Sequence, residues 1–339
     1  MARRKETIVH RRSANAVQNL YLKVYKNDIK KTEETLKQNI LNLWDLKRTD
    51  IEHIIQYALT LKKDRNKFVG HQPLIGKTIG LLFEKASTRT RISFETAMNQ
   101  LGGSVIYLNP KDTQISRNEP IKDTSRVLSG YLDAIVIRTY AQQFIEEMAK
   151  WSQIPVINAL TDMYHPCQIL SDVMTIVEQF STFSDLNIAW IGDGNNVAHS
   201  WINIAAILGL NLTLACPKDF MPSPDVLKKA QEKGMGKIKI TTDPEEAATS
   251  ADVINTDVWA SMGQESELEE RKQIFQPYQV NQDLIRHAKD QVIILHCLPA
   301  HRGEEITDDV LEGNNSVVWK QAENKMYLHK ALLEKLLSS

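Results

Sequence analysis

The segment Thr78-Ile79-Gly80-Leu81-Leu82-Phe83 is followed, three residues later, by Ser87-Thr88-Arg89-Thr90-Arg91 and then by Ile92-Ser93-Phe94-Glu95. The first part is a short apolar run of the length typical of a buried strand. Ser87 and Thr88 are residue types that favour the N-terminus of a helix, so the second part predicts a helix start. A buried strand that leads directly into a helix is the repeating unit of parallel sheets.

The same unit recurs along the chain. With 339 residues, the chain also exceeds the usual size of a single hydrophobic core. We therefore expect an α/β fold of two doubly wound domains, each a parallel sheet covered by helices, linked by interdomain helices. The further apolar runs that predict strands are Ser104–Leu108, Ala134–Ile137, Val156–Leu160, Asn187–Ile191, Asn211–Ala215, Lys237–Thr241, Val253–Asn255 and Val292–Leu295.

The boundary between the two domains is expected in a helix around Pro166–Phe180. This places residues 39–172 in the first domain and residues 173–320 in the second, while an amphipathic helix over residues 321–337 crosses back to complete the first. Residues 1–38 form a basic and polar extension that we expect to lie outside the fold. Asp50 is expected to cap a helix whose apolar residues recur at helical spacing, namely Ile51, Ile54, Ile55, Ala58 and Leu59.

The composition is that of a globular cytosolic protein. The formal net charge of -1 argues against a general nucleic-acid binder, which would carry a basic surplus. No apolar run approaches the roughly 18 residues that a membrane-spanning helix requires. The three cysteines, Cys167, Cys216 and Cys297, lack C-x-x-C spacing and fit a reducing compartment. We therefore expect a cytoplasmic protein without a membrane or nucleic-acid partner.

The N-terminal extension bears on this expectation. Its first two dozen residues carry six basic side chains against a single acid, Glu6, and they lack the apolar core of a secretory signal. An organellar transit peptide has such a composition, and so has a solvated basic tail. We favour the tail.

Ligands of parallel sheets collect at the carboxyl ends of the strands, where helices begin, so polar clusters at these points are candidate sites. The run Ser87–Arg91 is the first such cluster. Free backbone N–H groups at a helix start, the hydroxyls of Ser87, Thr88 and Thr90, and the guanidinium of Arg89 all suit a phosphate group. The alternative is an ordinary helix cap beside two solvated arginines. Two arginines interleaved with three hydroxyls favour a site for a small phosphorylated molecule.

Two further clusters carry donors for an oxygen atom. Arg138 ends the run Ala134–Ile137, where a cation can polarise a carbonyl or bind phosphate, although a lone arginine is often a salt-bridge partner. His165 precedes Pro166, which suits the first turn of a helix, and Gln168 lies one turn further on. His165 and Gln168 can therefore converge as donors on one carbonyl oxygen.

The remaining clusters lie in the second domain. The run Asp193-Gly194-Asn195-Asn196 lacks the third glycine of a dinucleotide-binding motif, and its amides suit a zwitterion, with Asn196 able to bind a carboxylate. Asp257 and Cys297 both follow apolar runs and are expected to face one cleft, where an aspartate can hold an ammonium group. Cys297 is either a nucleophile or a small buried hydrophobe, and His296 is expected on the opposite side of its strand.

Together these motifs resemble those of the carbamoyltransferases. The Ser87–Arg91 run, Arg138 and His165-Pro166-Cys167-Gln168 resemble that family's carbamoyl-phosphate site. The pairing of Asp257-x-x-x-Ser261-Met262-Gly263 with His296-Cys297-Leu298-Pro299 resembles its ornithine-specific branch, whereas the aspartate-specific branch is expected to carry proline in place of Cys297. The resemblance runs from about Leu41 to the C-terminus.

The resemblance implies transfer of a carbamoyl group from carbamoyl phosphate to the side-chain amine of L-ornithine, giving L-citrulline and phosphate, as in arginine biosynthesis. It implies no metal and no other cofactor, a first domain that binds carbamoyl phosphate and a second that binds ornithine. Family members are trimers or multiples of trimers, and Gln114 matches a residue contributed by the neighbouring subunit.

The residues that the resemblance assigns to carbamoyl phosphate are Ser87, Thr88, Arg89, Thr90, Gln114, Arg138, His165, Gln168, Cys297, Leu298 and Lys325. Of these, the resemblance gives a part in catalysis to Arg138, His165, Gln168 and Cys297. The residues that it assigns to ornithine are Asn196, Asp257, Ser261 and Met262.

One position departs from the family pattern. Where the family has arginine after an Ala-Glu-Asn run, this chain has Lys325. Lysine keeps the charge but loses the planar fork of guanidinium, so we expect weaker binding of carbamoyl phosphate. Two alternatives stay open: a carbamoyltransferase for another amine, such as putrescine or an acylated ornithine, and a non-catalytic ligand-binding relative.

Overall fold

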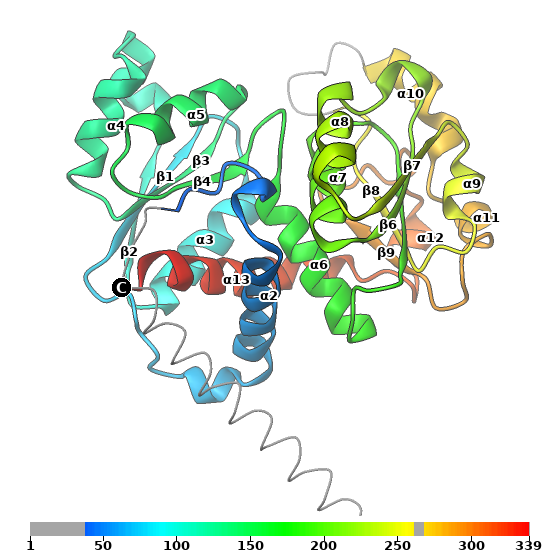
Figure 1. The fold of residues 1–339 in the computed structure, drawn as a ribbon, viewed down its shortest axis with the longest axis horizontal. Coiled ribbons are helices and arrows are strands. Elements are labelled where there is room, and N and C mark those ends of the chain that lie inside the picture. Colours follow the sequence, from blue (N-terminus) through cyan, green and yellow to red (C-terminus); the bar gives the residue numbers. More distant parts are fainter. Residues whose placement is uncertain (1–37, 261–267, 339) are drawn as a thin grey trace, which may run out of the picture. The chain divides into compact units, whose positions relative to one another are not determined.

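The structure, a computed structural model, describes residues 38–260 and 268–338 (Figure 1). Of the predicted extension over residues 1–38, only Gln38 lies within these ranges, and the predicted ornithine ligands Ser261 and Met262 lie outside them. Among the described residues no helix combines the length and the apolar character that a membrane span needs.

The first sheet contains four parallel strands in the order β2-β1-β3-β4. The strands are β1 (Thr78–Phe83), β2 (Ser104–Leu108), β3 (Ala134–Arg138) and β4 (Val156–Leu160). They alternate with the helices α3 (Thr88–Gln100), α4 (Ile121–Ser129) and α5 (Gln142–Trp151). Strand β3 is buried along its whole length, which explains its continuously apolar run, whereas the edge strand β2 is partly exposed.

The second sheet contains five parallel strands in the order β7-β6-β5-β8-β9. The strands are β5 (Asn187–Ile191), β6 (Asn211–Ala215), β7 (Lys237–Thr241), β8 (Val253–Thr256) and β9 (Ile293–His296). The helices of this part are α7 (Asn196–Leu208), α8 (Pro224–Lys233), α9 (Pro244–Ala248), α10 (Leu268–Phe275), α11 (Gln282–Ile285) and α12 (Asp308–Leu311).

Three helices connect and cover these sheets: α2 (Arg48–Lys63), α6 (Pro166–Phe180) and α13 (Val318–Leu337). Helix α6 is buried from Pro166 to Val177 and packs against both β4 and α7. Helix α13 packs against α2, α3 and α6, so the C-terminal segment returns to the helices of the first sheet, as Figure 1 shows. Short 3-10 helices occupy Leu43–Asp45, Arg65–Phe68, Pro110–Asp112, Gln114–Arg117, Lys218–Phe220 and Gln276–Tyr278.

The predicted fold class is confirmed, since both sheets are parallel and alternate with helices. Each predicted apolar run forms a strand, and the limits differ by one residue in three of them. Strand β3 extends to Arg138, β8 extends to Thr256, and β9 runs from Ile293 to His296.

The prediction that Asp50 caps α2 is wrong. The helix begins at Arg48, after Lys47, and Asp50 lies within its first turn. The Asp50 carboxylate instead reaches back to accept a hydrogen bond from the Lys47 backbone N–H at 3.1 Å and another from Lys335 Nζ at 3.0 Å. An acidic residue at the third helical position can satisfy a free N–H in this way, and sequence spacing alone does not separate it from the capping position.

Both sheets reverse their strand order at one point, and these points bring the predicted site residues together. In the first sheet β1 has β2 on one side and β3 on the other, and Phe83 at the end of β1 pairs with Arg138 at the end of β3. In the second sheet the reversal lies between β5 and β8, ahead of Asp193 and Asp257. Such reversals leave a crevice at the carboxyl ends of the strands, where ligands of this architecture bind.

Candidate active site

The start of helix α3, where the sequence predicts an anion-binding element, has a capped first turn. Ser87 has extended backbone, and its hydroxyl accepts a hydrogen bond from the Thr90 N–H at 3.2 Å, which makes it the N-cap. Thr88 is exposed, while the Thr90 side chain is buried behind it. The positive end of the helix dipole and the N–H groups of the first turn therefore face the end of β1, an arrangement that favours a bound phosphate.

Arg138 lies at the end of β3, beside this helix start, and is only 7% exposed. Its Nε has no hydrogen-bond partner among the described residues. Burial, with a further contribution from the nearby Arg89, lowers the pKa of Arg138 to about 10, while Cys297 and Asp257 oppose the shift. Burying a guanidinium with an unpaired N–H costs free energy unless a polar group accepts a hydrogen bond from it. Arg138 is therefore suited to bind an anion or a carbonyl oxygen.

His165 is another predicted site residue with a buried polar atom that lacks a partner among the described residues. It precedes α6, its backbone N–H donates to Ser200 Oγ at 2.8 Å, and its ring Nδ1 has no partner among the described residues. Burial, together with the cations of Lys325 and Arg138, lowers the pKa of His165 well below its ordinary value. The imidazole is therefore neutral at physiological pH, and it can donate only one hydrogen bond at a time.

Gln168 lies one turn into α6, as predicted, but most of the hydrogen-bonding capacity of its side chain is used by other residues of the protein. Its Nε2 donates to Asp172 Oδ1 at 2.8 Å, and its Oε1 accepts from Lys325 Nζ at 2.9 Å. One N–H of the amide remains for a ligand. The predicted convergence of His165 and Gln168 on a single oxygen therefore relies on this remaining hydrogen.

Lys325 comes from helix α13 and reaches both the start of α3 and Gln168 of α6. Its Nζ donates to Thr90 Oγ1 at 3.2 Å as well as to Gln168, and the residue is 5% exposed. Burial is the main cause that lowers the pKa of Lys325 to about 8, with Arg138 acting in the same direction and Cys297 against it.

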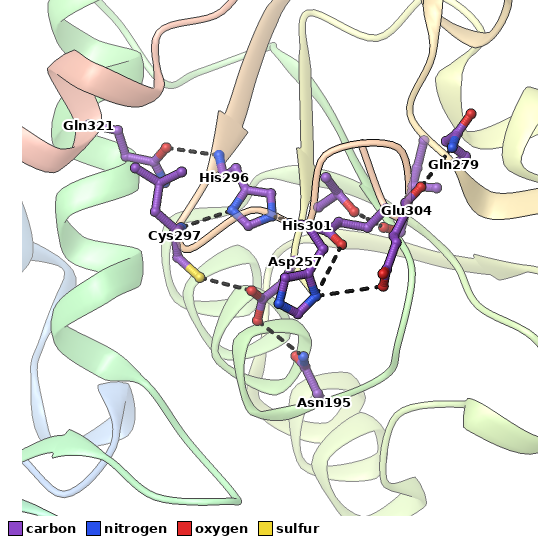
Figure 2. A network of polar contacts seen from close by, with 12 residues as sticks. Asn195, Asp257, Gln279, His296, Cys297, His301, Glu304 and Gln321 are labelled. Atoms are coloured by element: carbon purple, nitrogen blue, oxygen red, sulfur yellow. Dashed lines mark hydrogen bonds and ion pairs between the residues drawn. The ribbon is translucent and has the colours of Figure 1, made fainter. Parts of the chain in front are cut away.

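Asp257 and Cys297 lie together, as predicted. Cys297 Sγ donates to Asp257 Oδ1 at 3.0 Å, and Asn195 Nδ2 donates to Asp257 Oδ2 at 3.3 Å, so the carboxylate is held from both sides (Figure 2). Burial first, and then the Asp257 charge, raise the pKa of Cys297 well above its ordinary value. Cys297 is therefore a thiol at neutral pH, which argues against its use as a nucleophile.

His296 lies beside this pair, since one of its ring nitrogens is within 4.8 Å of the Asp257 carboxylate and of Cys297 Sγ, so the predicted placement of His296 on the opposite side of its strand is wrong. Its ring also belongs to a buried hydrogen-bond network. Its Nε2 lies 3.0 Å from Glu305 Oε1, and its Nδ1 accepts from the Leu298 N–H at 2.8 Å. Its backbone N–H donates to Gln321 Oε1 at 2.9 Å. His296 thus holds the loop after β9, in which Leu298 has a left-handed φ of 58°.

The two asparagines after β5 make different hydrogen bonds. Asn195 caps α7 and accepts from two backbone N–H groups, while Asn196 Nδ2 donates to the Thr161 carbonyl at 2.6 Å. The predicted carboxylate ligand, Asn196, is therefore partly occupied by the backbone after β4. Gln114 is exposed and begins the 3-10 helix Gln114–Arg117, which lies between β2 and α4 in the sequence.

Two family models match the chain over nearly all of the described residues. The carbamoyl-P binding domain of aspartate/ornithine carbamoyltransferase matches residues 38–178, and the Asp/Orn binding domain matches residues 184–336. A curated relative from Desulfotalea psychrophila, named ornithine carbamoyltransferase, is 53% identical over 302 residues, which cover 89% of this chain and 100% of the relative. The chain belongs to the aspartate/ornithine carbamoyltransferase family.

Solved structures of this carbamoyltransferase family agree with the fold. Ornithine carbamoyltransferase from Pyrococcus furiosus is 46% identical, with a TM-score of 0.86 over 89% of this chain and 98% of that one. The enzyme of the same name from Gloeobacter violaceus is 44% identical, with a TM-score of 0.79 over 89% of this chain and 99% of that one.

Sequence reasoning missed Asp172, a buried acid that contacts Gln168. Its Oδ1 accepts from Gln168 and from Gln321 Nε2, the latter at 2.6 Å, and Asn255 Nδ2 lies 3.4 Å from Oδ2. Burial raises the pKa of Asp172 to about 7, against the effect of these hydrogen bonds. Asp172 therefore orients Gln168 from behind, a role that only an acid placed one turn after Gln168 on the same helix face could have suggested.

Arg271 was missed as well. From α10 it forms a salt bridge with Asp193 at 2.5 Å, and both side chains are largely buried. Burial raises the pKa of Asp193 to about 6, although Arg271 acts in the opposite direction. The pair links α10 to the segment that follows β5.

Two groups among the described residues have the spacing of metal ligands. Asp257, His296 and Cys297 form one, and His301, Glu304 and Glu305 form the other. In the first group both ring nitrogens of His296 are already used by Leu298 and Glu305, so a metal ion there would have to displace an internal hydrogen bond. In the second, His301 Nδ1 lies 3.7 Å from Glu304 and 4.0 Å from Glu305.

Proposed function

We propose that this chain is an ornithine carbamoyltransferase, which transfers the carbamoyl group of carbamoyl phosphate to the side-chain amine of L-ornithine. The observation that carries the proposal is the pairing of two opposite charges across one site. Arg138 and His165, both buried with an unused donor, lie on one side, and the Asp257 carboxylate lies on the other. Such a site takes an anion with a carbonyl on one side and an ammonium group on the other.

Carbamoyl phosphate is assigned to the first half of the site. The phosphate is held by the α3 N-terminus, through Ser87, Thr88, Arg89 and Thr90, by Arg138 and by Lys325. The carbamoyl oxygen accepts from Arg138, from His165 and from the remaining N–H of Gln168. The backbone of Cys297 and Leu298 lies beside the carbamoyl amino group. The near approach of Lys325 to both Thr90 and Gln168 supports this placement.

Ornithine is assigned to the second half. Asp257 binds the α-ammonium group, Asn196 binds the α-carboxylate with Ser261 and Met262 beside it, and Cys297 lies next to the reacting amine. Asp257 already accepts from Cys297 and Asn195, which fixes its two oxygens in place before a substrate binds.

The reaction has two demands that these residues meet. The amine of ornithine must lose a proton before it can attack, and a negative oxygen then develops on the tetrahedral carbon. Three donors converge on that oxygen, from Arg138, His165 and Gln168, and one such donor is typically worth about 3 kcal/mol of transition-state stabilisation. Because the pKa of His165 is well below its ordinary value, its contribution is that of a neutral donor rather than a cation.

The same proposal assigns the two domains, the pathway and the oligomeric state. Residues 39–172, completed by residues 321–337, form the carbamoyl-phosphate domain, and residues 173–320 form the ornithine domain. The enzyme serves arginine biosynthesis in the cytoplasm and assembles as a homotrimer or a multiple of trimers. The exposed position of Gln114 supports a role for this residue in the site of a neighbouring subunit.

The acceptor specificity is tested by a panel of amines. Purified protein is assayed with carbamoyl phosphate and L-ornithine, putrescine or N-acetylornithine, and kcat/KM is compared. The kcat/KM for ornithine is expected to exceed that for the other amines by at least about 100-fold. An acceptor that lacks one charged group would leave Asp257 or Asn196 without its partner, which would cost about 3 kcal/mol. A higher kcat/KM for putrescine would overturn the assignment of Asn196 and Asp257.

A further inference from the structure

Lys325 lies at the junction of the two parts of the carbamoyl-phosphate site. Its Nζ is 3.2 Å from Thr90 Oγ1, on the phosphate side, and 2.9 Å from Gln168 Oε1, on the carbamoyl side. In the binding mode proposed above, an atom in this position faces the bridging oxygen that joins the phosphate to the carbamoyl carbon. We propose that Lys325 is a site of covalent self-modification, at which bound carbamoyl phosphate converts Nζ to carbamoyl-lysine. This inference rests on the proposed function.

Lys325 lacks the counter-charge that two other lysines have. The buried Lys85 pairs through Nζ with Asp162, and Nζ of the partly exposed Lys62 lies 2.9 Å from Glu178. The buried Lys330 also donates to a neutral oxygen, Gln100 Oε1 at 3.0 Å, and burial lowers its pKa, but the charge of Glu334 acts to raise it. Among the described residues no carboxylate lies within ion-pair distance of Lys325 Nζ, whose two partners are neutral oxygens. A buried ammonium without a counter-charge is held weakly in its charged form.

The charged groups around Lys325 act in both directions. Burial is the largest influence and lowers its pKa, to about 8, and Arg138 adds to this effect. Cys297, Cys167 and Asp172 act to raise it. A substantial neutral fraction therefore exists near pH 8, and the neutral amine is the nucleophilic form of lysine.

The chemical step parallels the transfer to ornithine. The lone pair of neutral Nζ attacks the carbamoyl carbon and forms a C–N bond. The bond from that carbon to the bridging oxygen breaks, and the phosphate departs with the electron pair. One Nζ proton passes to the phosphate, so that a lysine amine and carbamoyl phosphate give carbamoyl-lysine and hydrogen phosphate. No oxidant, metal or further reactant is involved.

The location of Lys325 makes the modification selective. The residue is 5% exposed, so cyanate released into solution by decomposing carbamoyl phosphate would react first with exposed lysines, such as Lys111. Bound carbamoyl phosphate instead has the reacting carbon inside the crevice. Arginine at this position would be inert, because its guanidinium stays protonated. Modified Lys325 is neutral and bulkier, so the enzyme loses a phosphate-binding cation and its activity falls.

The test is incubation of the full chain with carbamoyl phosphate at pH 8 in the absence of ornithine. Intact mass, peptide mapping after Glu-specific digestion and citrulline-forming activity are followed together. We expect one carbamoyl group on Lys325, a loss of activity that matches the modified fraction, and slower modification when ornithine is present. Lys325→Arg should keep its own starting activity through the same incubation. Lys330→Arg removes another buried lysine of α13 and should be modified at Lys325 like the parent.

Four outcomes separate this inference from the proposed function. Citrulline formation with an unmodified Lys325 overturns the inference and leaves the proposed function standing. Equal modification of Lys325 by free cyanate, at the concentration that carbamoyl phosphate releases, also overturns it. Modification of Lys325, together with no citrulline formation by protein that has not been preincubated with carbamoyl phosphate, supports the reactive lysine and removes the proposed function. Absence of both overturns both.

Discussion

Cys297 Sγ lies 3.0 Å from Asp257 Oδ1, so the residue that follows β9 donates a hydrogen bond to the acid that follows β8. Asn195, from the start of α7, holds the other oxygen of the same carboxylate. Three segments from different parts of the sequence therefore fix a single negative charge in the crevice. The thiol keeps its proton because burial and the adjacent charge both disfavour a thiolate.

The first prediction concerns the charge of Asp257. Asp257→Asn should lower kcat/KM for ornithine by about 10- to 100-fold, since a hydrogen bond to a charged group is worth about 1.5–3 kcal/mol. The KM for carbamoyl phosphate should change little. Steady-state kinetics with each substrate varied in turn measures both effects. Asp290→Asn, which changes an exposed aspartate of the same part of the chain, is the matched control. An equal loss for both substrates would contradict the assignment.

The second prediction separates the two interpretations of Cys297. Cys297→Ala should lower kcat by about tenfold, the effect of one lost hydrogen bond of about 1–1.5 kcal/mol. Removal of a true catalytic nucleophile costs up to about 10⁶-fold in kcat. A variant with no measurable turnover but with an intact fold by circular dichroism would show that the thiol reacts covalently.

The third prediction concerns Lys325. Lys325→Arg should lower the KM for carbamoyl phosphate by about fivefold, because guanidinium offers a two-pronged, charge-assisted contact worth about 1 kcal/mol more than the single ammonium. Lys330→Arg, a change on the same helix at a residue that contacts Gln100, should leave this KM unchanged. An unchanged or raised KM for Lys325→Arg would refute the expectation.

The fourth prediction is a pH dependence of stability due to Asp172. Burial raises its folded-state pKa to about 7, above the ordinary value of 3.8. Between these values the folded protein retains a proton that the unfolded chain has released, so the Asp172 contribution to stability falls as the pH rises towards 7. Asp172→Asn removes this titration and keeps an oxygen for Gln168 and Gln321.

Urea denaturation at several pH values measures this effect. The free energy of unfolding of Asp172→Asn, relative to that of the parent, should rise between about pH 4 and pH 7 and then level off. A difference that stays constant over this range would show that Asp172 is ionised throughout.

The fold and the outline of the site could be predicted from the sequence because both depend on local patterns. Strand β3, for example, is a continuous apolar run that ends at Arg138, and the Ser87 cap of α3 is encoded within the four residues Ser87–Thr90. The meeting of Asp257 and Cys297 also followed, since residues after neighbouring parallel strands share one edge.

The hydrogen bonds that the polar side chains of the site make within the protein could not be predicted. Gln168 is held by Asp172, one turn away, and by Lys325, 157 residues further along the chain. Asn196 donates to the Thr161 carbonyl, 35 residues earlier. These contacts arise from the packing of α6, α7 and α13, and no local spacing specifies them. The error at Asp50 is of a smaller kind, since an acid can stabilise a helix start from more than one position.

The central claim is that one chain holds carbamoyl phosphate beside ornithine. The most direct test is the formation of citrulline and phosphate by the purified protein when both substrates are supplied. The parent protein should form the two products in equal amounts, and Arg138→Ala should lower kcat by about 100- to 1000-fold, the effect of one lost oxyanion donor. No citrulline from the folded parent protein, or an Arg138→Ala variant as active as the parent, would contradict the account.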